Sequence, residues 1–300
     1  MRVGWIGVGV MGRHMCAHLI DRGHTATVFS RTAAKCAPLL DKGAMLATSP
    51  REVARASDVV FTVVSTPDDV RRVVLDPADG VFAGLREGGV LVDMTTSTPT
   101  LAVELGAEAV RRGFGVLDAP VSGGDVGAKA GTLSIMCGGE LTTFETVLPL
   151  LECMGRNVRL MGGAGSGQHT KMCNQILAAS NMVGVCESLL YAHRAGLDVE
   201  AVIKAVGAGA AGSWAMNNLG VKVASRDLAP GFMIEHMVKD LRIALREADA
   251  MGLQLRGLAF AKRMYEELQA CGHGRDGTQA LILALEKLAA DEPTGRAKES

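Results

Sequence analysis

This chain of 300 residues lacks an excess of either charge, since 31 Lys and Arg residues balance 32 Asp and Glu residues. It has neither a basic face or tail nor an acidic run, so we expect no nucleic-acid partner. No apolar run reaches the ~18 residues that a membrane helix needs, so we expect no membrane partner either.

The seven cysteines lack any C-x-x-C spacing, and their number is odd. This pattern predicts reduced thiols, as in a cytoplasmic protein, and no zinc or other metal site. The first residues are not typical of a secretory signal, because glycines interrupt any apolar stretch there. We therefore expect a cytoplasmic location. Hydrophobic residues make up 48% of the chain, and its length suggests about two domains.

A glycine pattern lies between the first predicted strand, residues 2–6, and a helix-like pattern from Met11 to Leu19. G-x-G-x-x-G in this context is typical of a dinucleotide-binding turn. Its glycines turn tightly off the strand, admit a pyrophosphate and let the helix pack closely, while the helix N-terminus attracts phosphate. The alternative is a tight turn in an ordinary α/β protein. The predicted cofactor contacts are Gly7, Val8, Gly9, Val10, Met11 and Gly12.

The end of the second predicted strand, residues 26–30, indicates which cofactor is used. NAD-binding turns place an acidic residue near this point to hold the ribose 2′-hydroxyl. Here Ser30 is followed by Arg31 and Thr32, with Lys35 one helical turn on, and a cationic site suits a 2′-phosphate. We therefore predict NADP, with NAD possible if Arg31 merely covers the adenine or points to water.

Two further strand ends should line the cofactor groove, because ligands of such sheets lie beyond the carboxyl ends of the strands. The β-branched run 59–64 ends at a Ser-Thr-Pro turn, and the strand 90–93 ends in a Thr/Ser run before Pro99. One hydroxyl of the second run is expected to cap the next helix. The predicted contacts are Val64, Ser65, Thr66, Val70, Thr95 and Thr96.

A serine and two glycines, Ser122, Gly123 and Gly124, follow the strand 115–118. Such a turn can fold into a nest of N–H groups that captures a carboxylate, or it can be a simple loop. Strands and helices alternate up to residue 161, which predicts a Rossmann-type α/β domain over residues 1–163. Strand signals then stop, and residues 164–292 are predicted to form an all-α domain entered through one long helix. Residues 293–300 are expected to be a flexible tail.

Lys171, Asn174 and Gln175 share one face of that long helix, because they stand at i, i+3 and i+4. An amine and two amides are unusual on a helix that otherwise looks buried, since burial without partners is costly. They are candidates for catalysis, or Lys171 reaches solvent and the amides bond neighbouring helices. Farther on, Lys239 and Asp240 could be an ordinary surface pair.

Four motifs in order resemble the β-hydroxyacid dehydrogenase family, whose members include 3-hydroxyisobutyrate dehydrogenase and tartronate, glyoxylate and succinic semialdehyde reductases. The similarity runs from residue 1 to about residue 290. The motifs are Gly7–Gly12, Asp118–Gly124, Gly167–Gln175 and Phe232–Leu241.

The resemblance implies roles for the candidate residues. Lys171 matches the catalytic lysine, the turn Ser122–Gly124 matches the carboxylate-binding turn, and Asn174 matches a substrate-binding amide. Some members carry a second asparagine where this chain has Gln175, so either amide could contact substrate. Lys239 and Asp240 match the segment that closes over nicotinamide and substrate, and Thr95 or Thr96 matches a hydroxyl that contacts the cofactor. The resemblance also implies a homo-oligomer, a homodimer or homotetramer, in which the long helix packs between subunits.

The implied reaction moves a hydride between NADP(H) and a small 3-hydroxy acid, or the matching semialdehyde, which makes the substrate a small carboxylate. Lys171 would take or give the hydroxyl proton, which requires its pKa to fall from ~10.4 towards neutrality. Rival interpretations are phosphogluconate-type chemistry, for which the helical half is short, and imine reduction, against which Lys171 argues. A catalytically silent nucleotide sensor on the same fold is another rival.

Overall fold

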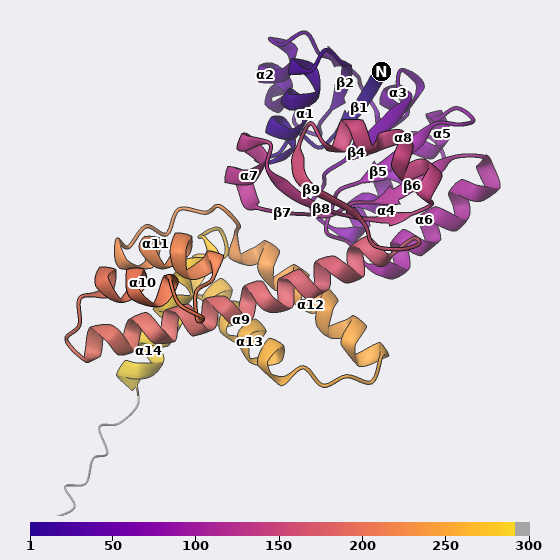
Figure 1. The fold of residues 1–300 in the computed structure, drawn as a ribbon. Helices are drawn as coiled ribbons and strands as arrows, with labels where there is room; N and C mark the ends of the chain where they lie inside the picture. The colour runs from indigo at the N-terminus through magenta and orange to yellow at the C-terminus, as the bar shows by residue number, and fades with distance from the viewer. Residues whose placement is uncertain (292–300) are drawn as a thin grey trace, which may run out of the picture. The chain divides into compact units, whose positions relative to one another are not determined.

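The computed structural model describes residues 1–291, which divide into two compact units, residues 1–174 and residues 175 onward (Figure 1). The expected flexible tail, residues 293–300, lies outside the described residues. None of the described helices combines the length and the apolar character that crossing a membrane requires.

The first unit is built on a sheet with the strand order β3-β2-β1-β4-β5-β6-β8-β7, and β9 pairs with β8. The strands from β3 to β6 run parallel, whereas β8 runs antiparallel to β6 and β7. The order reverses at β1, and such a reversal creates a crevice for ligands. The strands are β1 (Arg2–Ile6), β2 (Thr25–Phe29), β3 (Met45–Leu46), β4 (Val59–Thr62), β5 (Val90–Asp93), β6 (Gly115–Asp118), β7 (Val121–Ser122), β8 (Leu133–Gly139) and β9 (Gly155–Leu160).

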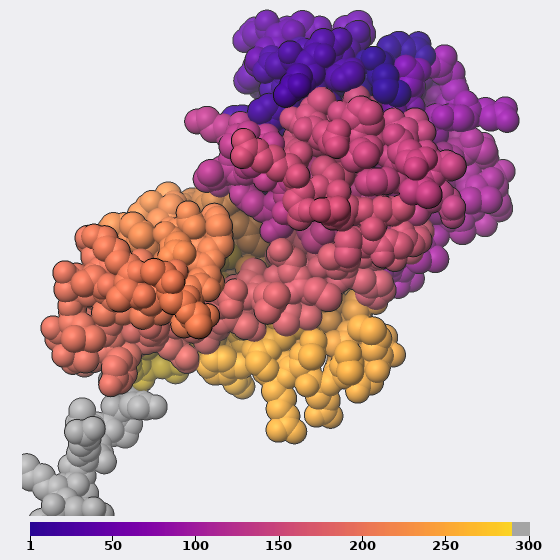
Figure 2. Space-filling model, viewed as in Figure 1, coloured from indigo at the N-terminus to yellow at the C-terminus, as the bar shows by residue number. Residues whose placement is uncertain are grey.

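Helices cover both faces of this sheet, which explains why the central strands β4 and β5 are buried along their whole length. In β4, Val59 and Phe61 pack into one core cluster and Val60 into the other. Residues around α8, drawn in pink, form the near surface of this unit in Figure 2. The first cluster receives α1 (Gly12–Asp21), α2 (Ala37–Leu40), α7 (Gly124–Ala130) and α8 (Leu141–Leu151). The second receives α3 (Pro50–Arg55), α4 (Pro67–Leu75), α5 (Val81–Gly84) and α6 (Pro99–Arg112).

The elements of the second unit's described part are all helices, apart from one isolated β-bridge between Met233 and Gly277. Its first helix, α9 (Ser166–Arg194), begins in the first unit and continues into the second. The predicted fold class, a Rossmann-type domain followed by an all-α domain with a long helix between them, is confirmed. The other helices are α10 (Val199–Gly207), α11 (Gly220–Ala224), α12 (Ile234–Ala250), α13 (Arg256–Leu268) and α14 (Leu281–Asp291), with a π-helical turn at Ala215–Leu219. At Gln269–His273 the chain kinks, because Gly272 has a φ of +94°.

Three local features differ from the sequence prediction or sharpen it. Ser122, the first residue of the predicted nest or loop Ser122–Gly124, lies in the short strand Val121–Ser122, which pairs with β8. Within the predicted all-α domain, residues 215 to 224 are helical although Gly212 and Gly220 flank and interrupt this segment. The hydroxyl that caps α6, the helix that begins at Pro99, belongs to Thr98. This hydroxyl accepts a hydrogen bond from the Leu101 N–H at 3.2 Å.

The last residue of β5, Asp93, is buried between neighbouring strands. Its Oδ1 accepts the Thr62 hydroxyl at 2.7 Å and the Thr95 N–H at 3.1 Å. Burial raises the pKa of Asp93 from 3.8 to about 6, although both hydrogen bonds favour the charged form. The folded protein therefore holds this proton more tightly than the unfolded chain does.

We expect Asp93→Asn to change the pH dependence of stability. The wild type loses free energy of unfolding as the pH rises from about 4 to about 6, because Asp93 must ionise while buried. The variant lacks this loss, so relative to the wild type it gains up to ~3 kcal/mol between these limits. Urea unfolding at a series of pH values measures the difference. Ser57→Ala, a buried change without a titrating group, is the control, and a difference independent of pH contradicts the prediction.

Candidate active site

The three glycines of the first loop differ in the room that each leaves for a side chain. Gly7 has φ +103°, and a Cβ there would lie 2.0 Å from the Val63 carbonyl oxygen. A Cβ on Gly12 would lie 2.2 Å from the Gly7 carbonyl oxygen, whereas one on Gly9 would meet nothing within 4 Å. The tight turn at Gly7 and the close packing at Gly12 are thus confirmed. Gly9 faces open space, as the approach of a pyrophosphate requires.

A groove of about 280 Å³ opens at the carboxyl ends of β1, β2 and β4, where the strand order reverses. Of the predicted cofactor contacts, the lining contains Gly7, Val8, Gly9, Ser30, Arg31, Val64 and Ser65. The lining also contains residues that the sequence analysis missed, among them Phe29, Pro50, Asp69, Arg72, Val73, Asp76 and Asp79.

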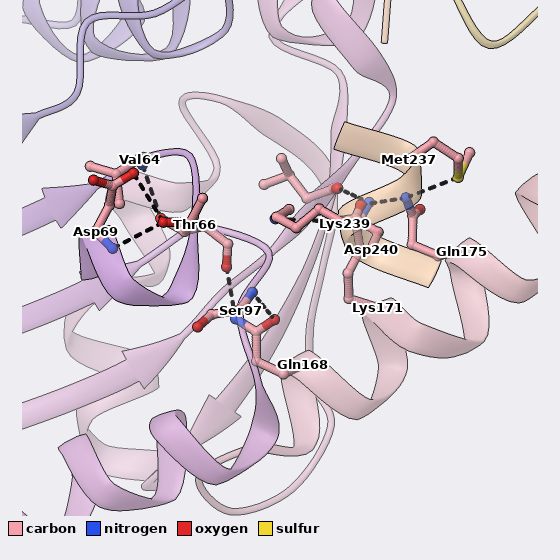
Figure 3. A network of polar contacts seen from close by, with 12 residues as sticks. Val64, Thr66, Asp69, Ser97, Gln168, Lys171, Gln175, Met237, Lys239 and Asp240 are labelled. Atoms are coloured by element: carbon pink, nitrogen blue, oxygen red, sulfur yellow. Dashed lines mark hydrogen bonds and ion pairs between the residues drawn. The ribbon is translucent and has the colours of Figure 1, made fainter. Parts of the chain in front are cut away.

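The charges at this groove centre on Asp69. Its Oδ1 accepts the Arg31 guanidinium at 3.1 Å and pairs with Arg72 as well. Its Oδ2 accepts the Thr66 hydroxyl at 3.1 Å, and Thr66 caps α4 by accepting the Asp69 N–H (Figure 3). The Arg31 side chain stays 67% exposed. Arg31 and Arg72 therefore both line the groove and pair with the same carboxylate, that of Asp69.

Several predicted cofactor contacts lie outside this lining. Val70 is fully buried among the core residues beneath α4, so the structure does not bring it to the groove. Val10 is exposed and faces a separate hollow between α1 and α7. Met11 precedes α1, and Thr32 and Lys35 are exposed beyond the end of β2.

Thr95 lies at the end of β5 and is buried by its own contacts. Its hydroxyl accepts the Val64 N–H at 3.0 Å, and its carbonyl accepts the Gln168 side-chain amide at 2.8 Å. The other end of that amide, Oε1, accepts the Ser97 N–H at 2.9 Å (Figure 3). Thr96 beside it is half-buried. Gln168, which the sequence analysis did not single out, thus joins the loop after β5 to α9.

A second buried carboxylate, Asp118 at the end of β6, receives the first turn of α9. Its Oδ1 accepts the Gly165 N–H and its Oδ2 the Gln168 N–H, both at 2.8 Å. Burial raises the pKa of Asp118, and these backbone N–H groups oppose the rise. A Cβ on Gly167 would lie 2.8 Å from Oδ2, so only glycine lets the helix come this close.

Lys171 lies within this first part of α9 and is 6% exposed. Its amine donates to the Val121 carbonyl at 2.8 Å, so it does not reach bulk water. Val121 directly precedes the turn predicted to bind a carboxylate, in which Gly123 has φ +126° and Gly124 φ +63°. The structure therefore brings Lys171 and this turn together.

In the second unit, Gln175 is 2% exposed and its amide donates to the Asp240 Oδ2 at 2.6 Å (Figure 3). The Asp240 Oδ1 lies 3.0 Å from the Lys239 amine, and Asp240 is almost fully buried. Lys239 and Asp240 are therefore not a simple surface pair. Near them, burial and the Lys239 charge lower the pKa of His236. Asn174, one residue before Gln175, is half-buried.

Comparison with known proteins agrees with this arrangement. Residues 2–163 match the family model of the NAD-binding domain of 6-phosphogluconate dehydrogenase. Residues 165–285 match the model described as NAD-binding of NADP-dependent 3-hydroxyisobutyrate dehydrogenase.

Individual relatives cover nearly the whole chain. The probable 3-hydroxyisobutyrate dehydrogenase-like 1, mitochondrial, of Arabidopsis thaliana is 54% identical over 96% of this chain and 86% of its own length. The 2-hydroxy-3-oxopropionate reductase of Escherichia coli is 37% identical over 96% of this chain and 98% of its own. A structure of Mycobacterium tuberculosis 3-hydroxyisobutyrate dehydrogenase with L-serine has a TM-score of 0.86 at 30% identity, covering 95% of this chain and 98% of that one.

The chain belongs to the β-hydroxyacid dehydrogenase family. It is a Rossmann-fold oxidoreductase, an NAD(P)-dependent hydroxyacid dehydrogenase.

The loop glycines allow cofactor approach and packing to be tested separately. We expect Gly9→Ala to leave the melting temperature of the cofactor-free protein almost unchanged, because its Cβ meets no atom. The dissociation constant of the cofactor should rise about tenfold or more, since the methyl group fills the path of the pyrophosphate. Gly12→Ala should instead lower the melting temperature, because its Cβ meets the Gly7 carbonyl. Calorimetry and thermal melts give both readouts, and normal cofactor affinity in Gly9→Ala argues against this groove.

Proposed function

We propose that this enzyme transfers a hydride between NADP(H) and a small 3-hydroxy acid or the corresponding semialdehyde, with Lys171 as the general acid and base. The observation that carries the proposal is the buried Lys171 amine, bonded to the carbonyl that precedes the turn Ser122–Gly124. An amine held at this place can exchange a proton with a substrate hydroxyl bound beside the turn.

The cofactor supplies the hydride chemistry, and the chain supplies binding, orientation and proton transfer. The open space at Gly9 and the groove at the ends of β1, β2 and β4 fit a dinucleotide. During oxidation Lys171 takes the proton of the substrate hydroxyl, and during reduction it returns that proton to the carbonyl oxygen. The first of these steps requires the neutral amine.

In this proposal Ser122, Gly123 and Gly124 hold the substrate carboxylate. Gly123 and Gly124 both have positive φ, and turns with such residues can direct backbone N–H groups at an anion. Asn174 rather than Gln175 then contacts the substrate, since the Gln175 amide already donates to Asp240. Lys239 and Asp240, with Thr96 or Thr95, contribute to holding the cofactor and the substrate. Asp240 acts by fixing Gln175 and Lys239.

NADP is the proposed cofactor because Arg31 and Arg72 both face the groove at the end of β2, while no acidic residue ends that strand. Asp69 pairs with both arginines, and the Arg31 side chain stays 67% exposed, so its guanidinium is accessible to a 2′-phosphate. Ser30, Thr32 and Lys35 add hydroxyls and a further cation at the same strand end, and NAD remains a usable cofactor in the proposal.

We further propose a homo-oligomer, a homodimer or homotetramer, held together in part by α9. This helix exposes large apolar side chains, with Leu177 63% and Tyr191 75% exposed. Exposed apolar groups of this size on one helix favour a protein partner.

All seven cysteines are free, which supports the proposed cytoplasmic location.

Lys171→Met should abolish turnover, with kcat falling at least about a thousandfold, because general acid–base catalysis contributes factors of this size. Binding of NADPH should stay within about twofold, since Lys171 does not line the nucleotide groove. Steady-state absorbance assays with a panel of semialdehydes, and fluorescence titration of NADPH, measure the two effects. Lys204→Met, an exposed lysine on α10, is the control. A kcat within a few-fold of wild type for Lys171→Met means that another group carries the proton.

Arg31→Gln tests the choice of cofactor. The KM for NADPH should rise about tenfold or more, because a charge-assisted contact with the 2′-phosphate is lost. The KM for NADH should change little, since NADH carries a hydroxyl at that position. Arg71→Gln is the matched control, because Arg71 lies on α4 beside Arg72 but pairs with Glu104. Equal changes for both cofactors contradict the assignment.

A further inference from the structure

The start of α9 is fixed by two buried side chains that have no part in the reaction proposed above. Asp118 accepts the N–H groups of Gly165 and Gln168 with opposite oxygens of its carboxylate. The first turn of a helix carries N–H groups without partners inside the helix, so a carboxylate is well suited to hold it. Gly138 and Gly167 leave no space for a Cβ against Asp118, so the helix start has little freedom to shift.

The Gln168 side chain, which is fully buried, extends this attachment to the loop after β5. Its amide spans the Ser97 N–H and the Thr95 carbonyl, and the Thr95 hydroxyl accepts the N–H of Val64. Val64 lines the nucleotide groove. A continuous series of hydrogen bonds therefore runs from the wall of the groove to the first turn of α9.

We propose that Asp118 is a positioning residue for Lys171, with Gln168 as its second point of attachment. Lys171 follows Gln168 by less than one helical turn, so the place where α9 begins determines where the amine meets Val121. The inference rests on the proposed role of Lys171. A displacement of about 1 Å at a reacting group can cost a hundredfold in rate.

A carboxylate is needed at this position because both of its oxygens accept backbone N–H groups. In Asp118→Asn the side chain keeps its shape, but one oxygen becomes an NH₂ group that faces another donor. The start of α9 must then shift or lose one hydrogen bond. Lys171 would shift with it, while the glycine loop at β1 would keep its geometry.

The test measures kcat, cofactor binding and the solvent isotope effect on kcat in Asp118→Asn. We expect kcat to fall about tenfold to a hundredfold, because proton transfer through Lys171 slows. The dissociation constant of NADPH should stay within about twofold, and the solvent isotope effect on kcat should rise as proton transfer limits the rate. Leu150→Ala, a core truncation in α8 of the same unit, controls for lost stability. It should lower the melting temperature without raising the isotope effect.

A kcat within about twofold of wild type in Asp118→Asn overturns the proposal, as does a fall in kcat whose isotope effect matches that of Leu150→Ala. If Asp118→Asn does not fold, Gln168→Met takes its place with the same expectations and the same criteria. The Lys171→Met variant distinguishes a failure of the proposed function from a failure of the positioning role of Asp118. Full activity in Lys171→Met overturns the proposed function, whereas an inactive Lys171→Met beside a normal Asp118→Asn overturns only the positioning role.

Discussion

The contact between the Asp118 carboxylate and the first turn of α9 is the interaction on which the proposed role of Lys171 depends. Removing a carboxylate from water is costly, and burial here raises its pKa. Backbone N–H groups at a helix N-terminus offset that cost, since they also lack partners inside the helix. The sheet and α9 thus satisfy each other's buried polar groups. Because glycines line the contact, the two backbones meet closely enough for Lys171 to reach Val121.

The nucleotide groove follows a different physical logic, since it forms where the strand order reverses at β1. Gly7 and Gly9 form one part of its lining, and the charged residues Arg31, Asp69 and Arg72 form another. Asp69 pairs with Arg31 and Arg72 through its carboxylate, and its N–H donates to the Thr66 hydroxyl that caps α4. A carboxylate with two cationic partners is better suited to orienting guanidinium groups than to binding a ribose hydroxyl. The proposal that NADP is the cofactor depends on this orientation of Arg31.

Much of the fold could be predicted from the sequence, because the strands of a doubly wound sheet are apolar on both faces and end in glycine or polar turns. The motif Gly7–Gly12 and the helix face that carries Lys171 could also be predicted, because each depends only on residues close together in the sequence. What the sequence could not reveal depends on partners distant in the chain. Asp118 and Gln168 gain importance only when β6, the loop after β5 and α9 meet. Val70 was misjudged because its position near a strand end says nothing about which way α4 turns it.

The continuity of α9 has a consequence for recombination between relatives of this enzyme. The compact units divide at residues 174 and 175, in the middle of an unbroken helix from Ser166 to Arg194. A chimaera joined at that division would take Lys171 from one parent and Gln175 from the other, on successive turns of one rod. A junction before Ser166 would separate Asp118 from the backbone that it holds. Parents exchanged at either point must therefore share the residues on both sides of it, so the helix and its carboxylate anchor are best inherited as one block.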